Sequence, residues 1–190
     1  MKKQIPNTLT IFRIILVPIF IYVILSDMNF SYLLGLTIFI IASITDALDG
    51  KLARKYNVES KFGMFMDPLA DKMLVMGAFF AFLFIPILNN IVCIWMVALI
   101  LLRDILVTLL RLFMKKKNLL MVTSEIAKLK TTSQLMSIIL LLLALSINSK
   151  VSITLFAEYL FSIMIIVTLF TVYTGVDYYY KNLKLMKSKN

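Results

Sequence analysis

The chain has 190 residues, of which 61% are hydrophobic and 16% are charged, and its formal net charge is +10. Soluble domains are only about 45–50% apolar, so this composition excludes an ordinary soluble protein and indicates an integral membrane protein. A single cysteine, Cys93, excludes an intrachain disulfide.

Apolar segments recur along the whole chain at lengths suited to a bilayer. A spanning helix needs about 20 mainly apolar residues. Six segments approach this length, at 8–26, 33–50, 66–88, 91–114, 132–148 and 152–177. No repeat or flexible linker separates them. We therefore expect an all-α integral membrane protein with six transmembrane helices in one bundle, forming a single domain over residues 1–190.

Three stretches are more polar than the predicted helices. Residues 5–10 are expected to be a turn or interfacial segment before the first helix. Residues 51–65 are expected to form a cytoplasmic loop. Residues 115–131 mix basic and apolar side chains and predict a short interfacial helix before the fifth span. Within this stretch, Thr123 or Ser124 could cap the helix that follows.

The positive charges gather on one side of the predicted bundle. Lysines and arginines occupy the N-terminus, the stretch 51–61, the stretch 115–130 and the C-terminus, whereas the other three connections contain only Lys150. The positive-inside bias then places both termini and the two basic loops in the cytoplasm of a multi-pass cell-membrane protein. This distribution favours anionic lipid headgroups over nucleic acid as the partner.

Four acids lie at the predicted cytoplasmic ends of the second and third helices. Asp46 and Asp49 are three residues apart, and Asp67 and Asp71 are four apart, so each pair projects from one helix face. A short connection joins the two helices. We expect the four carboxylates to converge there, with the active site facing the cytoplasm.

Converging carboxylates near a bilayer need protons or cations to offset their repulsion. The chain has no histidine and one cysteine, so hard oxygen ligands favour Mg²⁺ or Mn²⁺ over zinc. Two such ions could hold a pyrophosphate. Two other readings stay open. The acids could be interfacial charges that cap helices and pair with nearby lysines, or they could serve a small cation transporter.

Two glycines and an arginine accompany the acids. Gly50 follows Asp49, and Gly63 lies four residues before Asp67, so a ligand could approach either position closely. Arg54 lies one turn beyond Gly50 and could donate to a phosphate.

This spacing resembles the full signature of the CDP-alcohol phosphotransferase family, which the chain carries as Asp46-x-x-Asp49-Gly50-x-x-Ala53-Arg54, eight residues, and Gly63-x-x-x-Asp67-x-x-x-Asp71. The resemblance implies transfer of a phosphatidyl group from CDP-diacylglycerol to an alcohol, with release of CMP. It also implies a six-helix architecture and a homodimer.

The resemblance further implies a role for each position of the signature. Two metal ions would be bound by Asp46, Asp49, Asp67 and Asp71. Asp71 would also be the catalytic base that takes the proton of the acceptor hydroxyl. Positions around CDP would be Gly50, Ala53, Arg54 and Ser60, with Gly63 beside them.

The acceptor is predicted from residues outside the signature. Residues 5–13, 67–72 and 128–134 are similar to family members that use glycerol-3-phosphate. Relatives usually carry glycine in place of Ala127 and glutamate in place of Asp104. Serine, an inositol compound or phosphatidylglycerol stays open as the acceptor.

A phosphorylated acceptor also requires cations. Arg103 and Arg111 interrupt the apolar fourth segment, where we place them on one helix face, and Asp104 could pair with one of them. Lys128 and Lys130 begin the fifth helix. We expect these four cations to bind the acceptor phosphate, although the lysines could instead be a solvated basic face.

Overall fold

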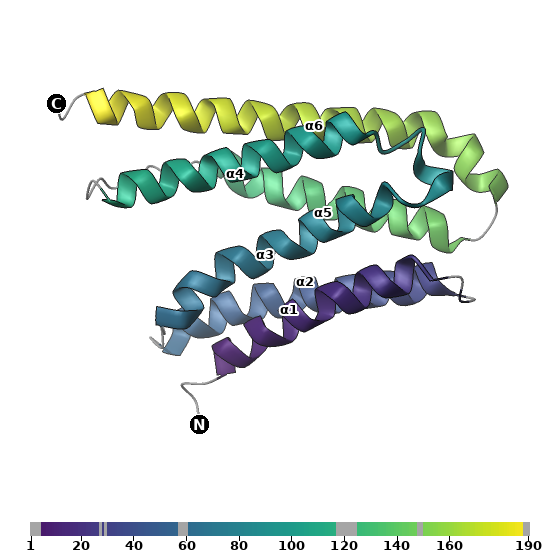
Figure 1. The fold of residues 1–190 in the computed structure, drawn as a ribbon, viewed down its shortest axis with the longest axis horizontal. Coiled ribbons are helices and arrows are strands. Elements are labelled where there is room, and N and C mark those ends of the chain that lie inside the picture. Colours follow the sequence, from purple (N-terminus) through teal and green to yellow (C-terminus); the bar gives the residue numbers. More distant parts are fainter. Residues whose placement is uncertain are drawn as a thin grey trace. The chain divides into compact units, whose positions relative to one another are not determined.

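A computed structural model describes residues 5–26, 28, 30–56, 61–116, 125–147 and 150–187, and the side chains of residues 11–26, 28, 30–45, 72–114, 129–147 and 156–182. Over these ranges the chain is helical, without strands (Figure 1). The helices are α1 (Ile5–Ile24), α2 (Ser31–Tyr56), α3 (Lys61–Phe82), the short 3-10 helix η1 (Pro86–Leu88), α4 (Ile94–Lys116), α5 (Glu125–Ser146) and α6 (Lys150–Lys187). The prediction of an all-α chain with six helices is confirmed.

Two predicted connections are wrong because polar residues extend the helices. Residues 5–10 are the first turns of α1, where Pro6 is tolerated because N–H groups in a first turn have no intrahelical acceptor. Residues 51–56 continue α2, and residues 61–65 open α3. Only residues 57–60 separate the two helices, so the expected loop over 51–65 shrinks to these four residues.

The later boundaries also shift. Residues 115–116 end α4 and residues 125–131 open α5, so no separate interfacial helix forms in the described part of 115–131. Thr123 and Ser124 lie outside the described residues. Helix α6 runs ten residues beyond its predicted end and has 38 residues, which at about 1.5 Å per residue is much longer than a hydrocarbon core of about 30 Å.

Among the described residues, two helices are long and apolar enough to cross a membrane, over Leu129–Ser146 and Phe156–Asn182. Shorter apolar runs lie in three other helices, at Ile11–Ile24, Ser31–Thr45 and Lys72–Phe82. Six spans and cytoplasmic termini remain predictions.

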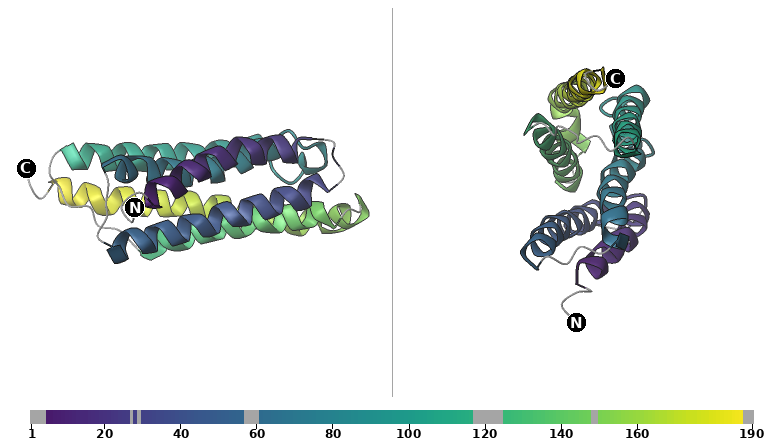
Figure 2. Two further views of the ribbon diagram at one scale, coloured as in Figure 1. Left: turned by 90° about the horizontal axis from the view of Figure 1, so that it is seen from below. Right: turned by 90° about the vertical axis from the view of Figure 1, so that its left-hand side faces the viewer.

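Contacts divide the chain into two compact units. The first comprises Met1–Leu88 with Ile138–Leu155, and the second Asn89–Ser137 with Phe156–Asn190. In the first unit α1 packs against both α2 and α3 (Figure 1; Figure 2). The prediction of a single domain stays a prediction.

The core of the first unit is aromatic and closely packed. Phe20 of α1 and Phe39 of α2 are fully buried, with ring centroids 5.7 Å apart. Gly77 of α3 faces Val17 and Ile21 of α1 at a distance that barely admits a methyl group. Small residues allow such close helix crossings in membranes, and α1 thereby fixes α2 and α3, the helices that carry the signature.

The second unit buries polar side chains among its helices and exposes apolar ones. Gln134, Thr168, Thr171 and Asn182 are all at most 1% exposed. Leucines on α4 and α6 that do not line a described pocket are more than half exposed, at Leu112 and Leu169. Water-soluble proteins show the reverse arrangement, so this pattern fits helices surrounded by lipid.

Candidate active site

The signature lies on the ends of two consecutive helices that meet at the 57–60 connection (Figure 1). Asp46 lies ten residues before the end of α2, and Asp71 lies ten residues after the start of α3. Asp49 and Asp67 are seven and six residues from the same ends. The backbone therefore carries the two acid pairs at matching distances from one short connection.

The side chains of the signature lie outside the described ones. Asp46, Asp49, Gly50, Ala53 and Arg54 are on α2, whereas Gly63, Asp67 and Asp71 are on α3. Ser60 lies outside the described residues altogether. Three statements stay predictions: that the carboxylates converge, that they bind metal ions, and that the neighbouring residues contact the nucleotide. Within the described side chains no group of three or more His, Cys, Asp or Glu residues could hold a metal ion.

A buried arginine in the first unit is a further candidate that was not predicted. Arg13 of α1 is 0% exposed. A charge is rarely buried in a membrane helix unless it has a function or an opposite charge nearby. Its isolation within the apolar run of residues 11–24 was the signal that could have identified it.

Two of the four predicted acceptor cations are brought together by one carboxylate. Lys130 Nζ donates to both oxygens of Asp104, at 2.7 Å to Oδ1 and 2.9 Å to Oδ2. Arg103 Nη1 donates to the same Oδ1 at 3.0 Å. Asp104 is 4% exposed and Lys130 is 6% exposed. The expected pairing of Asp104 with an arginine is confirmed, and Lys130 joins the pair to form a cluster in which two cations donate to one buried carboxylate.

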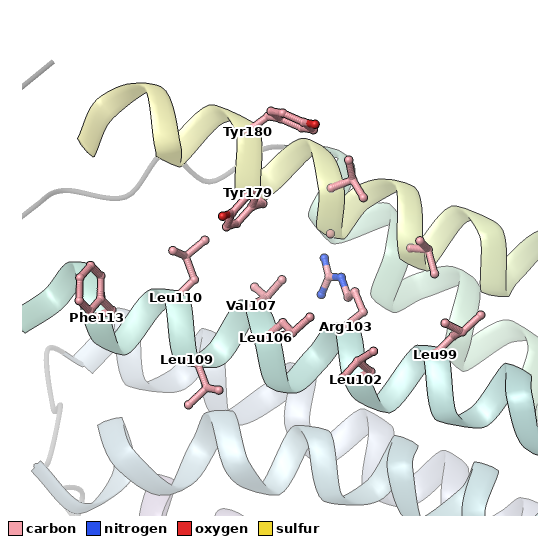
Figure 3. A pocket seen from close by; sticks show the side chains of 13 residues that line it. Leu99, Leu102, Arg103, Leu106, Val107, Leu109, Leu110, Phe113, Tyr179 and Tyr180 are labelled. Atoms are coloured by element: carbon pink, nitrogen blue, oxygen red, sulfur yellow. The ribbon is translucent and has the colours of Figure 1, made fainter. Parts of the chain in front are cut away.

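Arg103 also lines a pocket between α4 and α6. The pocket has a volume of about 730 Å³, and Leu106, Val107 and Val176 are among its apolar lining residues. The guanidinium of Arg103 extends from α4 toward α6 within it (Figure 3). A cation therefore lies in the wall of a mostly apolar pocket, which Tyr179 and Tyr180 also line.

The other two predicted cations are not part of this cluster as far as the structure describes them. Arg111 is exposed and does not line the pocket. Eight residues at about 100° each leave roughly 80° between it and Arg103 around α4, and of the two arginines Arg103 lines the pocket. Lys128 is on α5, and its side chain is outside those described. Phosphate binding by any of the four stays a prediction.

Helix α6 contributes polar groups that were not predicted. Thr174 Oγ1 accepts a hydrogen bond from Arg103 Nη2 at 3.1 Å. Thr171 Oγ1 accepts one from Gln134 Nε2 at 3.2 Å. Thr168, Thr171 and Thr174 recur every third residue in an apolar helix, which was the signal that could have identified a buried polar face.

Comparison with known proteins agrees with the signature. The family model of CDP-alcohol phosphatidyltransferase matches residues 3–174. A protein of Bacillus subtilis named CDP-diacylglycerol--glycerol-3-phosphate 3-phosphatidyltransferase is 35% identical over 98% of this chain and 99% of its own length. A protein of the same name from Rickettsia typhi is 36% identical over 93% of this chain and 96% of its own length. One from Escherichia coli is 35% identical over 75% of this chain and 78% of its own length. The chain therefore belongs to the CDP-alcohol phosphatidyltransferase family.

Proposed function

We propose that the protein transfers a phosphatidyl group from CDP-diacylglycerol to glycerol-3-phosphate, giving phosphatidylglycerophosphate and CMP. The observation that carries this proposal is the eight-position signature on α2 and α3. Relatives of similar length are named for the same reaction. The cluster of Arg103, Asp104 and Lys130 supports a phosphorylated acceptor, because it contains two cations and cations bind phosphate.

The donor set fits hard divalent cations. Four carboxylates lie in the signature of a chain without histidine, and Mg²⁺ and Mn²⁺ prefer such oxygen ligands. We expect Asp46, Asp49, Asp67 and Asp71 to hold two of these ions. When bound, the ions would offset the negative charge of the pyrophosphate and of the departing CMP.

The chain's own residues would perform the remaining steps. Arg103, Arg111, Lys128 and Lys130 would bind and orient the acceptor through its phosphate. Asp71 would take the proton of the acceptor hydroxyl as its oxygen bonds to the phosphorus that carries diacylglycerol. The bond from that phosphorus to CMP then breaks. Nucleotide contacts would come from Gly50, Ala53, Arg54, Ser60 and Gly63.

The membrane topology is part of the proposal. Six helices would span the cell membrane with both termini and the signature on the cytoplasmic side, since the basic residues gather there. The carboxylates would then meet the headgroup of CDP-diacylglycerol at the membrane surface. Two copies of the chain are expected to form a homodimer, as the family resemblance implies.

The test is a panel of acceptors given to the purified protein with CDP-diacylglycerol. With glycerol-3-phosphate as the acceptor, the protein should release CMP only when Mg²⁺ or Mn²⁺ is present. With serine, an inositol phosphate or phosphatidylglycerol as the acceptor, the protein should release much less CMP. Preference for an uncharged acceptor would refute the role of the cation cluster. No CMP with any acceptor, together with ion flux into vesicles that Asp71→Asn abolishes, would favour a cation transporter instead.

A further inference from the structure

Two consecutive residues of α6 hold Arg103 in place, and neither belongs to the signature. Thr174 Oγ1 accepts a hydrogen bond from Arg103 Nη2 at 3.1 Å. Its own proton is directed to the carbonyl oxygen of Thr171, at 2.8 Å. The hydroxyl lone pairs are thus left for the guanidinium. Since Thr174 is 3% exposed, water does not compete for this hydrogen bond.

Gly175 supplies the space through which the Arg103 side chain passes. A Cβ atom at position 175 would lie 2.6 Å from Cγ of Arg103, 3.4 Å from Cδ and 3.2 Å from Nε. Cγ is near the base of the side chain, so moving only the tip of the arginine would not relieve this contact. Any residue other than glycine therefore displaces the whole side chain of Arg103.

The hydrogen bonds that fix the guanidinium do not use all of its N–H groups. Nη1 donates to Asp104 and Nη2 to Thr174. Nε is buried and has no hydrogen-bond partner in the described part of the chain. Of the five N–H donors of an arginine, three are not used by these two bonds. Nε faces Gly175, so the two N–H groups left for a ligand are one on Nη1 and one on Nη2, and these can bind a phosphate with two parallel hydrogen bonds.

We propose that Thr174 and Gly175 are positioning residues that fix Arg103 so that the remaining N–H groups of Nη1 and Nη2 can bind the phosphate of the acceptor. This inference rests on the proposed function. Both residues act through Arg103, which lines the pocket between α4 and α6 (Figure 3). They should therefore affect the acceptor and leave the lipid donor unaffected.

The test compares KM values for glycerol-3-phosphate and for CDP-diacylglycerol in three variants. Thr174→Val removes the acceptor oxygen with little change in shape, and Gly175→Ala displaces the arginine. Each should raise KM for glycerol-3-phosphate by about tenfold and should change kcat and the other KM by less than about twofold. Thr174→Ser keeps the hydroxyl and should stay within about twofold of the wild type.

A double-mutant cycle separates positioning from general damage to the fold. In an Arg103→Ala background neither Thr174→Val nor Gly175→Ala should raise KM for glycerol-3-phosphate further. Gly77→Ala is the matched control, because it adds the same methyl group to a helix of the first unit. It should leave the ratio of the two KM values unchanged. Additive effects in the cycle, or equal rises in both KM values, would overturn the inference.

A spectroscopic readout keeps the inference testable apart from the reaction. If the wild type transfers nothing to glycerol-3-phosphate, the proposed function fails. The Nε–Hε resonance of Arg103 in ¹⁵N-labelled protein then decides about the positioning residues. A shift of that resonance in both Thr174→Val and Gly175→Ala supports the inference, and an unchanged resonance overturns it.

Discussion

Among individual residues, Asp104 carries a buried carboxylate that pairs with two cations at once. It lies between two cations that come from α4 and α5, and all three side chains are largely buried. Two like charges in a medium of low dielectric constant repel strongly, whereas one carboxylate between them offsets most of that repulsion. Asp104 thereby allows two cations to stay close together inside the protein.

Asp104→Asn should destabilise the protein more than the loss of a surface ion pair does. Removing one partner of a buried pair costs about 3–5 kcal/mol, which for a chain of this length lowers Tm by roughly 6–20 °C. Thermal unfolding in detergent measures this. Asp177→Asn is the control, because it breaks an exposed i,i+4 pair with Lys181 that contributes less than about 0.5 kcal/mol. Equal shifts in the two variants would contradict the account.

The two acid pairs of the signature predict different losses. Asp71→Asn should lower kcat by at least about 10²-fold, because it removes the proposed base, while much of the binding of CDP-diacylglycerol remains. Asp49→Asn should lose both turnover and lipid binding. Calorimetric titration of each variant in nanodiscs with CDP-diacylglycerol and Mg²⁺ separates these outcomes. If both variants bind the lipid equally well, the different roles assigned to the two residues are wrong.

Sequence reasoning identified the signature because its spacing is fixed along the chain, and it could not identify contacts between distant segments. Lys130 and Asp104 are 26 residues apart, so their pairing depends on how α4 and α5 pack. Nothing in the sequence distinguishes Gly175 from other glycines, because its contact with the Arg103 side chain depends on how α4 and α6 pack. Such positions are visible only when the tertiary arrangement is known.

At the scale of the helices, hydropathy predicted their number and misplaced their ends. Residues 51–56 are too polar to be read as membrane helix, yet they continue α2. Likewise, α6 extends to Lys187 through a basic tail. A helix continues as long as its backbone bonds can form and its residues have adequate helix propensity, whereas hydropathy reports only the part suited to lipid. The longer helices place all eight positions of the signature on helical backbone.

The crossings of α1 predict a ranking of two glycine substitutions. A Cβ atom at Gly35 would overlap Cγ2 of Ile24, whereas at Gly77 the nearest atom, Cγ1 of Val17, would be 3.2 Å away. Overpacking costs about 1–3 kcal/mol, so Gly35→Ala should lower Tm more than Gly77→Ala does. Thermal unfolding of both variants checks this order.

Ile24→Ala provides the control for that comparison. In the Gly35→Ala background it should destabilise less than it does in the wild type, because it removes the overlapping atom. A larger effect of Gly77→Ala than of Gly35→Ala would show that the contact between α1 and α2 is not as tight as described.

At the scale of the whole molecule, the distribution of polarity and charge predicts how the protein sits in a membrane. Lysines and arginines cluster at both termini and on the helix ends that flank residues 57–60 and 117–124. Buried polar groups and exposed leucines suit a lipid environment. The active site would then open to the cytoplasm, where a soluble acceptor and CMP can enter and leave.

This orientation can be tested by labelling single cysteines in intact cells. Cys93 is first replaced by serine, and cysteine is then placed at Asn90 or at Lys181, both of which are exposed. A membrane-impermeant maleimide should label position 90 in intact cells and position 181 only after the membrane is opened. The opposite pattern would invert the proposed topology, and the active site with it.

The proposed reaction is tested most directly by measuring whether the acceptor is incorporated into lipid. Purified protein in nanodiscs receives CDP-diacylglycerol, Mg²⁺ and ¹⁴C-labelled glycerol-3-phosphate. Label should enter the lipid extract in step with CMP release, and Asp71→Asn should incorporate at least about 10²-fold less. Absence of label from the lipid extract of the wild type would contradict the proposed function.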